Sequence, residues 1–282
     1  MNLSAQLSGV AASLDLFSLP TFMQRALIAA ALVGMCAPAV GVYLVQRRMS
    51  LLGDGIGHIA FAGVGAGILF GTSPVITAVL VSAAGAVVAE LVRSRAKASG
   101  DIALAILFYG GIATGTLLIS INDSGMNQVP AFLFGQIYTV RGDELVMMAV
   151  LAAVVLAVTV GLRKVLFSVS SDEDFARVSG VPVDWLNVLL AVTAAMTITI
   201  AMRIVGLLLI SAMMVLPVAA TSQVARSFFG TIFGAITLGV VLSTSGVLLS
   251  WPLDVGAGAL IVVLAIGVFF VTALLGRLRG RT

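Results

Sequence analysis

The chain has few charged residues, one histidine and one cysteine. Charged side chains make up 10% of its 282 residues, against about 25% in ordinary soluble domains. Hydrophobic residues reach 60% and the mean hydropathy is +1.19, which excludes a soluble globular fold of this size. The single cysteine, Cys36, cannot form an internal disulfide. Lys and Arg lie in short clusters between apolar runs, a pattern typical of membrane topology and not of nucleic-acid binding.

Several catalytic motifs are also missing from the sequence. It contains no P-loop, no HExxH motif and no Gly-rich dinucleotide fingerprint. The chain is therefore not expected to hydrolyse ATP or to be an enzyme.

Continuous apolar runs of about 20 residues fill most of the chain, and each is long enough to cross a bilayer as a helix. They predict an all-α transmembrane bundle of eight or nine spans, forming one domain over residues 1–282. The predicted spans are 25–46, 54–71, 74–93, 101–121, 143–163, 184–202, 204–222, 228–250 and 256–276. The second is short and rich in glycine and the seventh contains Pro217, so either could be a broken or re-entrant helix.

The basic residues predict the orientation of the spans. Twelve of the fifteen Lys and Arg residues fall in alternate connections or at the C-terminus, which the positive-inside rule places in the cytoplasm. They are Arg47, Arg48, Arg93, Arg95, Lys97, Arg163, Lys164, Arg177, Arg226, Arg277, Arg279 and Arg281. The C-terminus is then cytoplasmic, and with nine spans the N-terminus is outside.

The longest polar connection runs from Arg163 to Asp184 on the predicted cytoplasmic side. Ser171 is expected to cap a short helix whose first turn is acidic, and Gly180 and Pro182 to end it after about two turns. Such a helix would be amphipathic and parallel to the membrane. The alternative is a plain connecting loop.

Asp54 and His58 are the polar pair most suited to chemistry. Their spacing of four places both side chains on one face of a helix, where a carboxylate and an imidazole can reach one cation. Ionisable groups at membrane depth are costly and indicate function. The alternative is that Asp54 pairs with Arg47 and Arg48 at the interface while His58 donates to a backbone carbonyl.

Three segments resemble one transporter family. Residues 53–67, GDGIGHIAFAGVGAG, are similar to the Gly-Asp-x-x-x-His signature of the zinc and manganese ABC permease family, although Ala62 stands where that family usually has proline. Residues 203–221, RIVGLLLISAMMVLPVAAT, resemble the family's Gly-x-Leu-Leu and Leu-x-x-Pro-Ala-Ala pattern. Residues 172–183, DEDFARVSGVPV, are similar to the coupling segment of these permeases and of the larger cobalamin and iron-chelate permeases.

The resemblance implies a cobalamin-permease-like fold in the cell membrane and the import of a divalent metal ion. Asp54 and His58 would touch the ion, and a coupling segment at 168–183 would dock on a separate ABC ATPase that supplies the ATP hydrolysis. The coupling residues implied are Asp172, Glu173, Asp174, Phe175, Ala176, Arg177 and Gly180. The implied partners are a second copy of the chain, two ATPase subunits and an extracytoplasmic metal-binding protein, with no covalent cofactor.

Several alternatives stay open. Asp plus His serves both zinc and manganese, and because affinity alone favours zinc, zinc is the expected ion and manganese the alternative. A permease for a siderophore or cobalamin chelate is the nearest rival, and a secondary transporter driven by an ion gradient is a more distant one. Arg203, at the outer junction of two spans, is either a gate or an interfacial anchor.

Overall fold

The computed structural model describes residues 20–95, 100–121 and 126–278 of the chain. These residues form helices and connections and contain no strand. The long helices are α2 (Thr21–Gln46), α3 (Leu52–Leu69), α4 (Pro74–Arg95), α5 (Gly100–Ser120), α7 (Gly142–Gly161), α10 (Val183–Met202), α11 (Ile210–Ser222), α12 (Phe228–Leu253) and α13 (Ala257–Leu278). Each coincides with one of the nine predicted spans, so the predicted all-α membrane fold is confirmed.

Seven of these helices are long and apolar enough to cross a membrane within the described residues. The described apolar part of α5 runs from Ala105 to Ser120, and η3 (Leu207–Leu209) with α11 forms the other shorter apolar segment. The second predicted span, α3, is one continuous helix despite its glycines. The seventh is the broken one, because α11 has only 13 residues and follows a turn.

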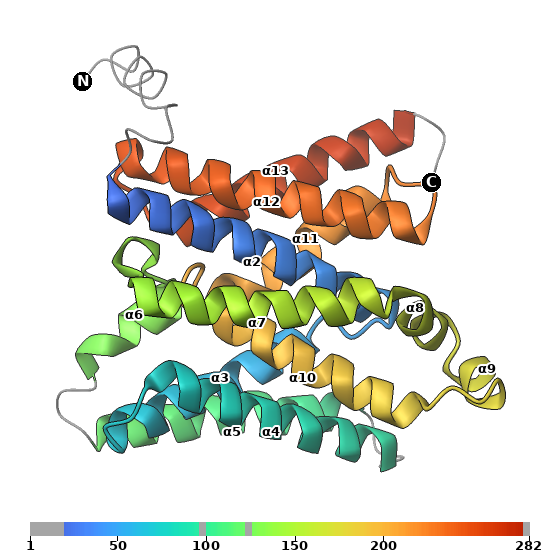
Figure 1. Cartoon of the computed structure of the whole chain (residues 1–282), viewed down its shortest axis with the longest axis horizontal. Coiled ribbons are helices and arrows are strands. Elements are labelled where there is room, and N and C mark those ends of the chain that lie inside the picture. Colours follow the sequence, from blue (N-terminus) through green and yellow to red (C-terminus); the bar gives the residue numbers. More distant parts are fainter. Residues whose placement is uncertain (1–19, 96–99, 122–125, 279–282) are drawn as a thin grey trace.

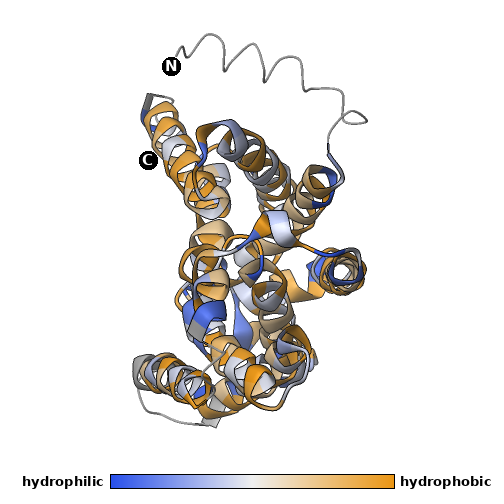
Figure 2. Cartoon of the chain, turned by 90° about the vertical axis from the view of Figure 1, so that its left-hand side faces the viewer, coloured by the Kyte–Doolittle hydropathy of each residue, from blue (hydrophilic) through white to orange (hydrophobic). Residues whose placement is uncertain are grey.

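The long helices lie roughly parallel and form one elongated bundle (Figure 1). α2 packs against α12, α11, α7 and α10, while α3 packs between α5, α4 and α10. Seen end-on, most ribbons are hydrophobic around the whole molecule (Figure 2). The span of α3 is 83% buried whereas those of α7 and α13 are each 22% buried, so α3 is an inner helix and α7 and α13 present apolar side chains to lipid.

Glycine allows α3 to be so deeply enclosed. A Cβ on Gly65 would lie 2.8 Å from the carbonyl oxygen of Gly115 in α5, closer than side chains tolerate. Toward the other neighbouring helix, α4, a Cβ on Gly63 would lie 2.7 Å from the Cα of Ala78. Small residues therefore let three backbones approach closely around the helix that carries Asp54 and His58.

The break between α10 and α11 is held by a second, shorter segment. Gly206 (φ 88°) and Gly135 (φ 77°) both adopt left-handed backbone conformations. Each of these two glycines packs directly against the backbone of the segment that contains the other. The N–H of Gln136 donates to the carbonyl of Arg203 (3.0 Å). The segment involved comprises η1 (Met126–Gln128), α6 (Val129–Phe134) and η2 (Ile137–Thr139), none of which the hydropathy windows predict.

The polar connection after α7 is more ordered than predicted. It forms α8 (Arg163–Ser171) and α9 (Glu173–Val178) at one end of the bundle. The ends of α2, α4, α7, α11 and α13 lie at that same end (Figure 1), so the described members of the predicted basic clusters gather there. Lys97, Arg279 and Arg281 lie outside the described residues.

Candidate functional site

Asp54 lies in the first turn of α3 and meets the start of α11. The hydroxyl of Ser211 donates a hydrogen bond to Asp54 Oδ1. The close approach depends on Gly53, since a Cβ there would already be 3.3 Å from Ser211 Oγ and 3.6 Å from Met214 Sδ. The break at Gly206 thus brings a hydroxyl of one span to the carboxylate of another.

Asp54 does not pair with Arg47 or Arg48, so the interfacial ion pair considered as an alternative is absent. Arg47 instead donates to Glu173 (3.0 Å) and Asn187 (2.7 Å). Among the described residues, no Lys or Arg forms a salt bridge with Asp54. The carboxylate is half-buried and is oriented by a neutral donor.

His58 is buried one turn further along α3, with 7% of its surface exposed. Its ring meets Phe108 of α5 edge to face at 4.1 Å. Nδ1 has no hydrogen-bond partner among the described residues, so it does not donate to a backbone carbonyl. Because buried polar atoms are nearly always satisfied, this imidazole nitrogen keeps hydrogen-bonding or ligand capacity for water or an ion.

The donor set within one chain is small. No group of three or more His, Cys, Asp or Glu side chains that could hold a metal ion occurs in the described residues. An oxygen and a nitrogen donor on successive turns can contact a passing cation but give a weak site. The sequence analysis does not identify Ser211 as a site residue, although Ser211 lies in the 203–221 segment that carries part of the resemblance.

The short helix predicted after residue 170 exists, but Ser171 does not cap it. Ser171 is the last residue of α8, and Asp172 is the N-cap of α9, with its Oδ1 accepting from the N–H of Phe175 (2.9 Å). Gly180 follows the helix in a left-handed conformation (φ 81°), as its predicted role as a stop requires. Phe175 (66% exposed) and Val178 (89% exposed) face outward together, as does Asp174, while Ala176 is buried.

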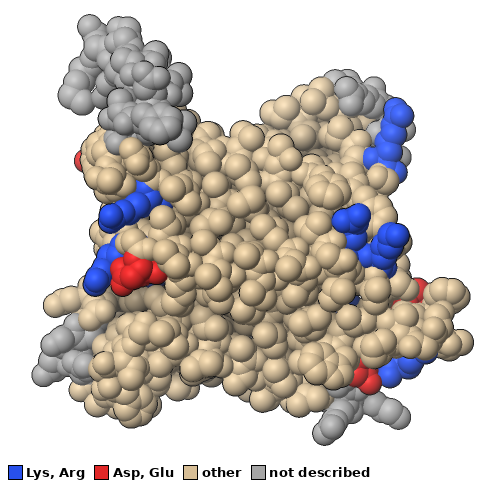
Figure 3. Space-filling model, in the orientation of Figure 1, with Lys and Arg blue, Asp and Glu red and all other residues tan. Residues whose placement is uncertain are grey.

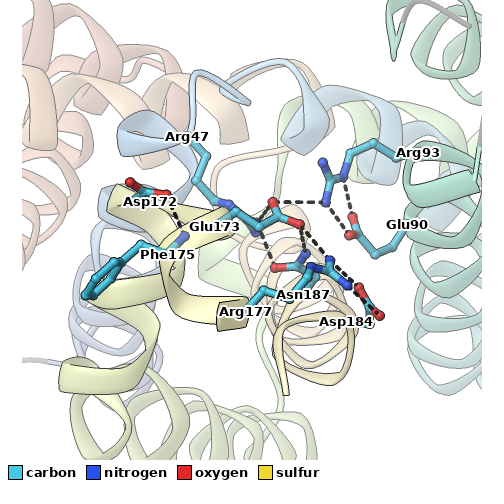
Figure 4. A network of polar contacts seen from close by, with 9 residues as sticks. All are labelled: Arg47, Glu90, Arg93, Asp172, Glu173, Phe175, Arg177, Asp184 and Asn187. Atoms are coloured by element: carbon cyan, nitrogen blue, oxygen red, sulfur yellow. Dashed lines mark hydrogen bonds and ion pairs between the residues drawn. The ribbon is translucent and has the colours of Figure 1, made fainter. Parts of the chain in front are cut away.

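Glu173 points the other way, into the bundle (Figure 4). Its carboxylate accepts hydrogen bonds from Arg47 (3.0 Å) and Asn187 (3.2 Å) and lies 3.8 Å from Arg93. Arg93 is held in turn by Glu90 in two hydrogen bonds. Burial and the neighbouring Arg93 lower the pKa of Arg47, and Glu173 opposes that shift. One carboxylate of α9 therefore links the ends of α2, α4 and α10.

Arg203, the candidate gate, is tied to α7. One of its terminal nitrogens donates to both carboxylate oxygens of Glu144 (2.9 Å each), and its guanidinium lies 5.6 Å from the ring centre of Phe132. Arg203 and Glu144 border a cavity of about 350 Å³ at the end of the bundle opposite α9. This ion pair joins α7 to the break after α10.

The fold and these residues define a multi-span membrane protein. It has a polar pair on a buried inner helix, a broken helix beside that pair, and a short exposed helix at the basic end.

Comparison with known proteins gives the family. Residues 20–276 match the ABC 3 transport family, and the chain belongs to this family. It is therefore a membrane subunit of an ABC transporter and not itself an enzyme, and the resemblance predicted from the sequence is confirmed.

Individual relatives are similar over most of their length. The manganese import system permease protein ScaB of Streptococcus parasanguinis is 31% identical over 88% of each chain. The chelated iron transport system membrane protein YfeD of Yersinia pestis is 31% identical over 90% of this chain and 85% of its own. The solved structure of PsaBC from Streptococcus pneumoniae in complex with Fab has a TM-score of 0.83 at 30% identity, covering 96% of this chain and 95% of that one.

Proposed function

We propose that the chain is the membrane-spanning permease subunit of an ATP-driven importer of a divalent metal ion, in which Asp54 and His58 contact the ion during passage. The observation that carries this proposal is the buried His58 Nδ1, which has no hydrogen-bond partner among the described residues. It lies one turn from the Asp54 carboxylate, with which no described Lys or Arg forms a salt bridge. A site with one carboxylate and one imidazole attracts a divalent cation yet allows release.

Manganese is the cargo that the relatives' names favour. A carboxylate, a hydroxyl and an imidazole suit manganese, and the same set also suits zinc, which binds more tightly to a given site. Zinc is therefore the alternative cargo, and the uptake assay that compares both ions decides between them.

The assembly proposed around the chain has four further components. A second copy of the chain would complete the central pathway, since the described residues of one chain contain no group of three or more His, Cys, Asp or Glu that could hold a metal ion. Two ABC ATPase subunits would bind at the basic end, which the positive-inside rule places in the cytoplasm. An extracytoplasmic metal-binding protein would deliver the ion at the opposite end, where Arg203 and Glu144 form the candidate gate.

α9 is the proposed contact with the ATPase, and its two faces have different tasks. Phe175 and Val178 form an exposed apolar patch at the end of the molecule. Such a patch suits burial in a groove of a partner. Glu173 faces inward to Arg47, only seven residues before Asp54. A displacement of α9 would therefore be conveyed to the start of α3 through a short, charge-assisted link.

ATP-driven uptake of manganese and zinc tests the proposal in proteoliposomes that hold the full complex. Asp54→Ala and His58→Ala should each lower uptake more than about tenfold, because each removes one of two ion contacts. Ser211→Ala should cause a smaller loss, since Asp54 keeps its charge. Ser243→Ala is the matched control: its buried hydroxyl donates to the carbonyl of Val240 on α12, and uptake should not change.

A chelate permease is the second candidate, because YfeD is named for chelated iron. A chelated metal needs no protein ligands, so uptake would then survive both Asp54→Ala and His58→Ala. That outcome would contradict the metal-ion hypothesis and favour the import of a metal chelate.

A further inference from the structure

A pocket of about 290 Å³ opens at the basic end, between α2, α8, α11 and the start of α12. Its inner wall is apolar and is formed by Val42, Val45 and Val218, and its rim is polar and includes Ser222, Arg226 and Thr231. We call it the α12 pocket. A hydrophobic interior with a polar, cationic rim matches the two parts of a phospholipid.

Cations near the α12 pocket have no carboxylate partners in the part of the chain that the structure describes. Arg226 on the rim and Arg163, Lys164 and Arg277 form no salt bridge with any described Asp or Glu. Arg163 instead lies 5.9 Å from the ring centre of Phe229. Arg277 belongs to the same corner, since a Cβ on Gly276 would lie 3.7 Å from the carbonyl oxygen of Gln223.

In the surface view, the blue side chains at the upper right, near the end of α13, have no red beside them (Figure 3). A small red patch lies just below the next blue group, and blue and red adjoin again lower down. An uncompensated positive corner at the ends of membrane spans faces the headgroups of the adjacent leaflet. Anionic headgroups are attracted to Lys and Arg side chains near the membrane surface.

The first turn of α12 adds fixed donors to the rim. Ser227 caps this 26-residue helix through Gly230 (3.1 Å), while the N–H groups of Phe228 and Phe229 lack acceptors within the helix. The ring of Phe228 packs on Phe167 (4.4 Å) and on Tyr43 (5.7 Å). The aromatic cluster fixes the helix start at the edge of the pocket.

We propose that the α12 pocket binds the phosphate-bearing headgroup of an anionic phospholipid, with Arg226 and the α12 N-terminus contacting the phosphate and the apolar wall contacting the upper acyl chain. Arg163, Lys164 and Arg277 supply attraction from the surrounding surface. The site is separate from Asp54 and His58 and does not depend on which ion the protein carries.

Native mass spectrometry of the delipidated full chain in detergent tests the site, with phosphatidylglycerol and phosphatidylcholine as probes. The wild-type chain should bind phosphatidylglycerol about tenfold more tightly than phosphatidylcholine. Arg226→Gln should reduce that ratio about fivefold. Ser222→Trp, which fills the pocket from an exposed position and keeps every charge, should reduce it similarly. Thermal unfolding confirms that both variants are folded.

The control is Arg48→Gln, which removes one exposed cation at the same end but outside the pocket lining. An equal loss for Arg48→Gln and Arg226→Gln would mean that only overall charge matters and would overturn the proposal. An unchanged ratio for Ser222→Trp would also overturn it. Inorganic phosphate at millimolar concentration should not displace the lipid; displacement would assign the site to a free anion.

Discussion

The basic end of the molecule contains two groups of cations in different surroundings. Arg47, Arg93 and Arg177 are paired with Glu173, Glu90 and Asp184, whereas Arg163, Lys164 and Arg226 have no carboxylate partner among the described residues. We call these the paired corner and the open corner. Both satisfy the same positive-inside rule, so that rule alone does not distinguish their functions.

Burial explains why the innermost cation of the paired corner needs a counter-charge. The side chain of Arg47 is 8% exposed, and a buried cation without a counter-charge is strongly unfavourable. Arg226 and Lys164 in the open corner are exposed and do not need one. Around Arg47 the paired corner is therefore an internal link between helices, and the open corner is a surface accessible to anions from outside.

The largest effect is expected from Glu173→Ala in the paired corner. This change leaves Arg47 buried near Arg93 without the carboxylate between them, which should destabilise the chain by about 2 kcal/mol and lower Tm in detergent by about 5 °C. In the assembled transporter, metal uptake per ATP hydrolysed should fall, because α9 loses its link to Arg47. Lys164→Ala, in the open corner, is the control; an equal loss of Tm there would contradict the comparison.

An intermediate effect is expected from Thr231→Glu, which gives the open corner a carboxylate. A negative charge on the rim of the α12 pocket should neutralise Arg226 and repel a phosphate, so the preference for phosphatidylglycerol should fall about fivefold. Thr231→Gln has the same shape without the charge and should retain the preference. If both variants lose it equally, side-chain size and not charge is responsible.

The sequence was sufficient for the long helices and for the short α9, and insufficient for α6 and α8. Apolar runs of about 20 residues predict helices because only helices satisfy the backbone in lipid, although the run at 204–222 is broken by a turn before α11. α8 and α6 have nine and six residues, and a hydropathy window of membrane length averages such segments with their neighbours. The glycines of α3 were compatible with an unwound segment or with close helix packing, and the structure has close packing against α4 and α5.

Prediction of the site was limited in a similar way. The spacing of Asp54 and His58 correctly placed both on one helix, since helical periodicity is local. Ser211 contacts Asp54 across 157 positions of sequence, and that contact exists only because the chain turns at Gly206. Glu173 reaches Arg47 across 126 positions, so no property of the short α9 sequence could show that this acidic residue faces inward while Asp174 faces out.

The smallest effect is expected from Arg177→Gln, at the exposed edge of the paired corner. Arg177 and Asp184 form an ion pair with 53% and 70% of their side chains exposed, and water screens such pairs. Hydrogen bonds to Asp184 raise the pKa of Arg177, so this contribution is present at neutral pH and is lost only in strongly alkaline solution. Tm should therefore match the wild type from pH 6 to 9. A drop as large as that of Glu173→Ala would contradict this expectation, because Arg47 and Asn187 should hold Glu173 in place without Arg177.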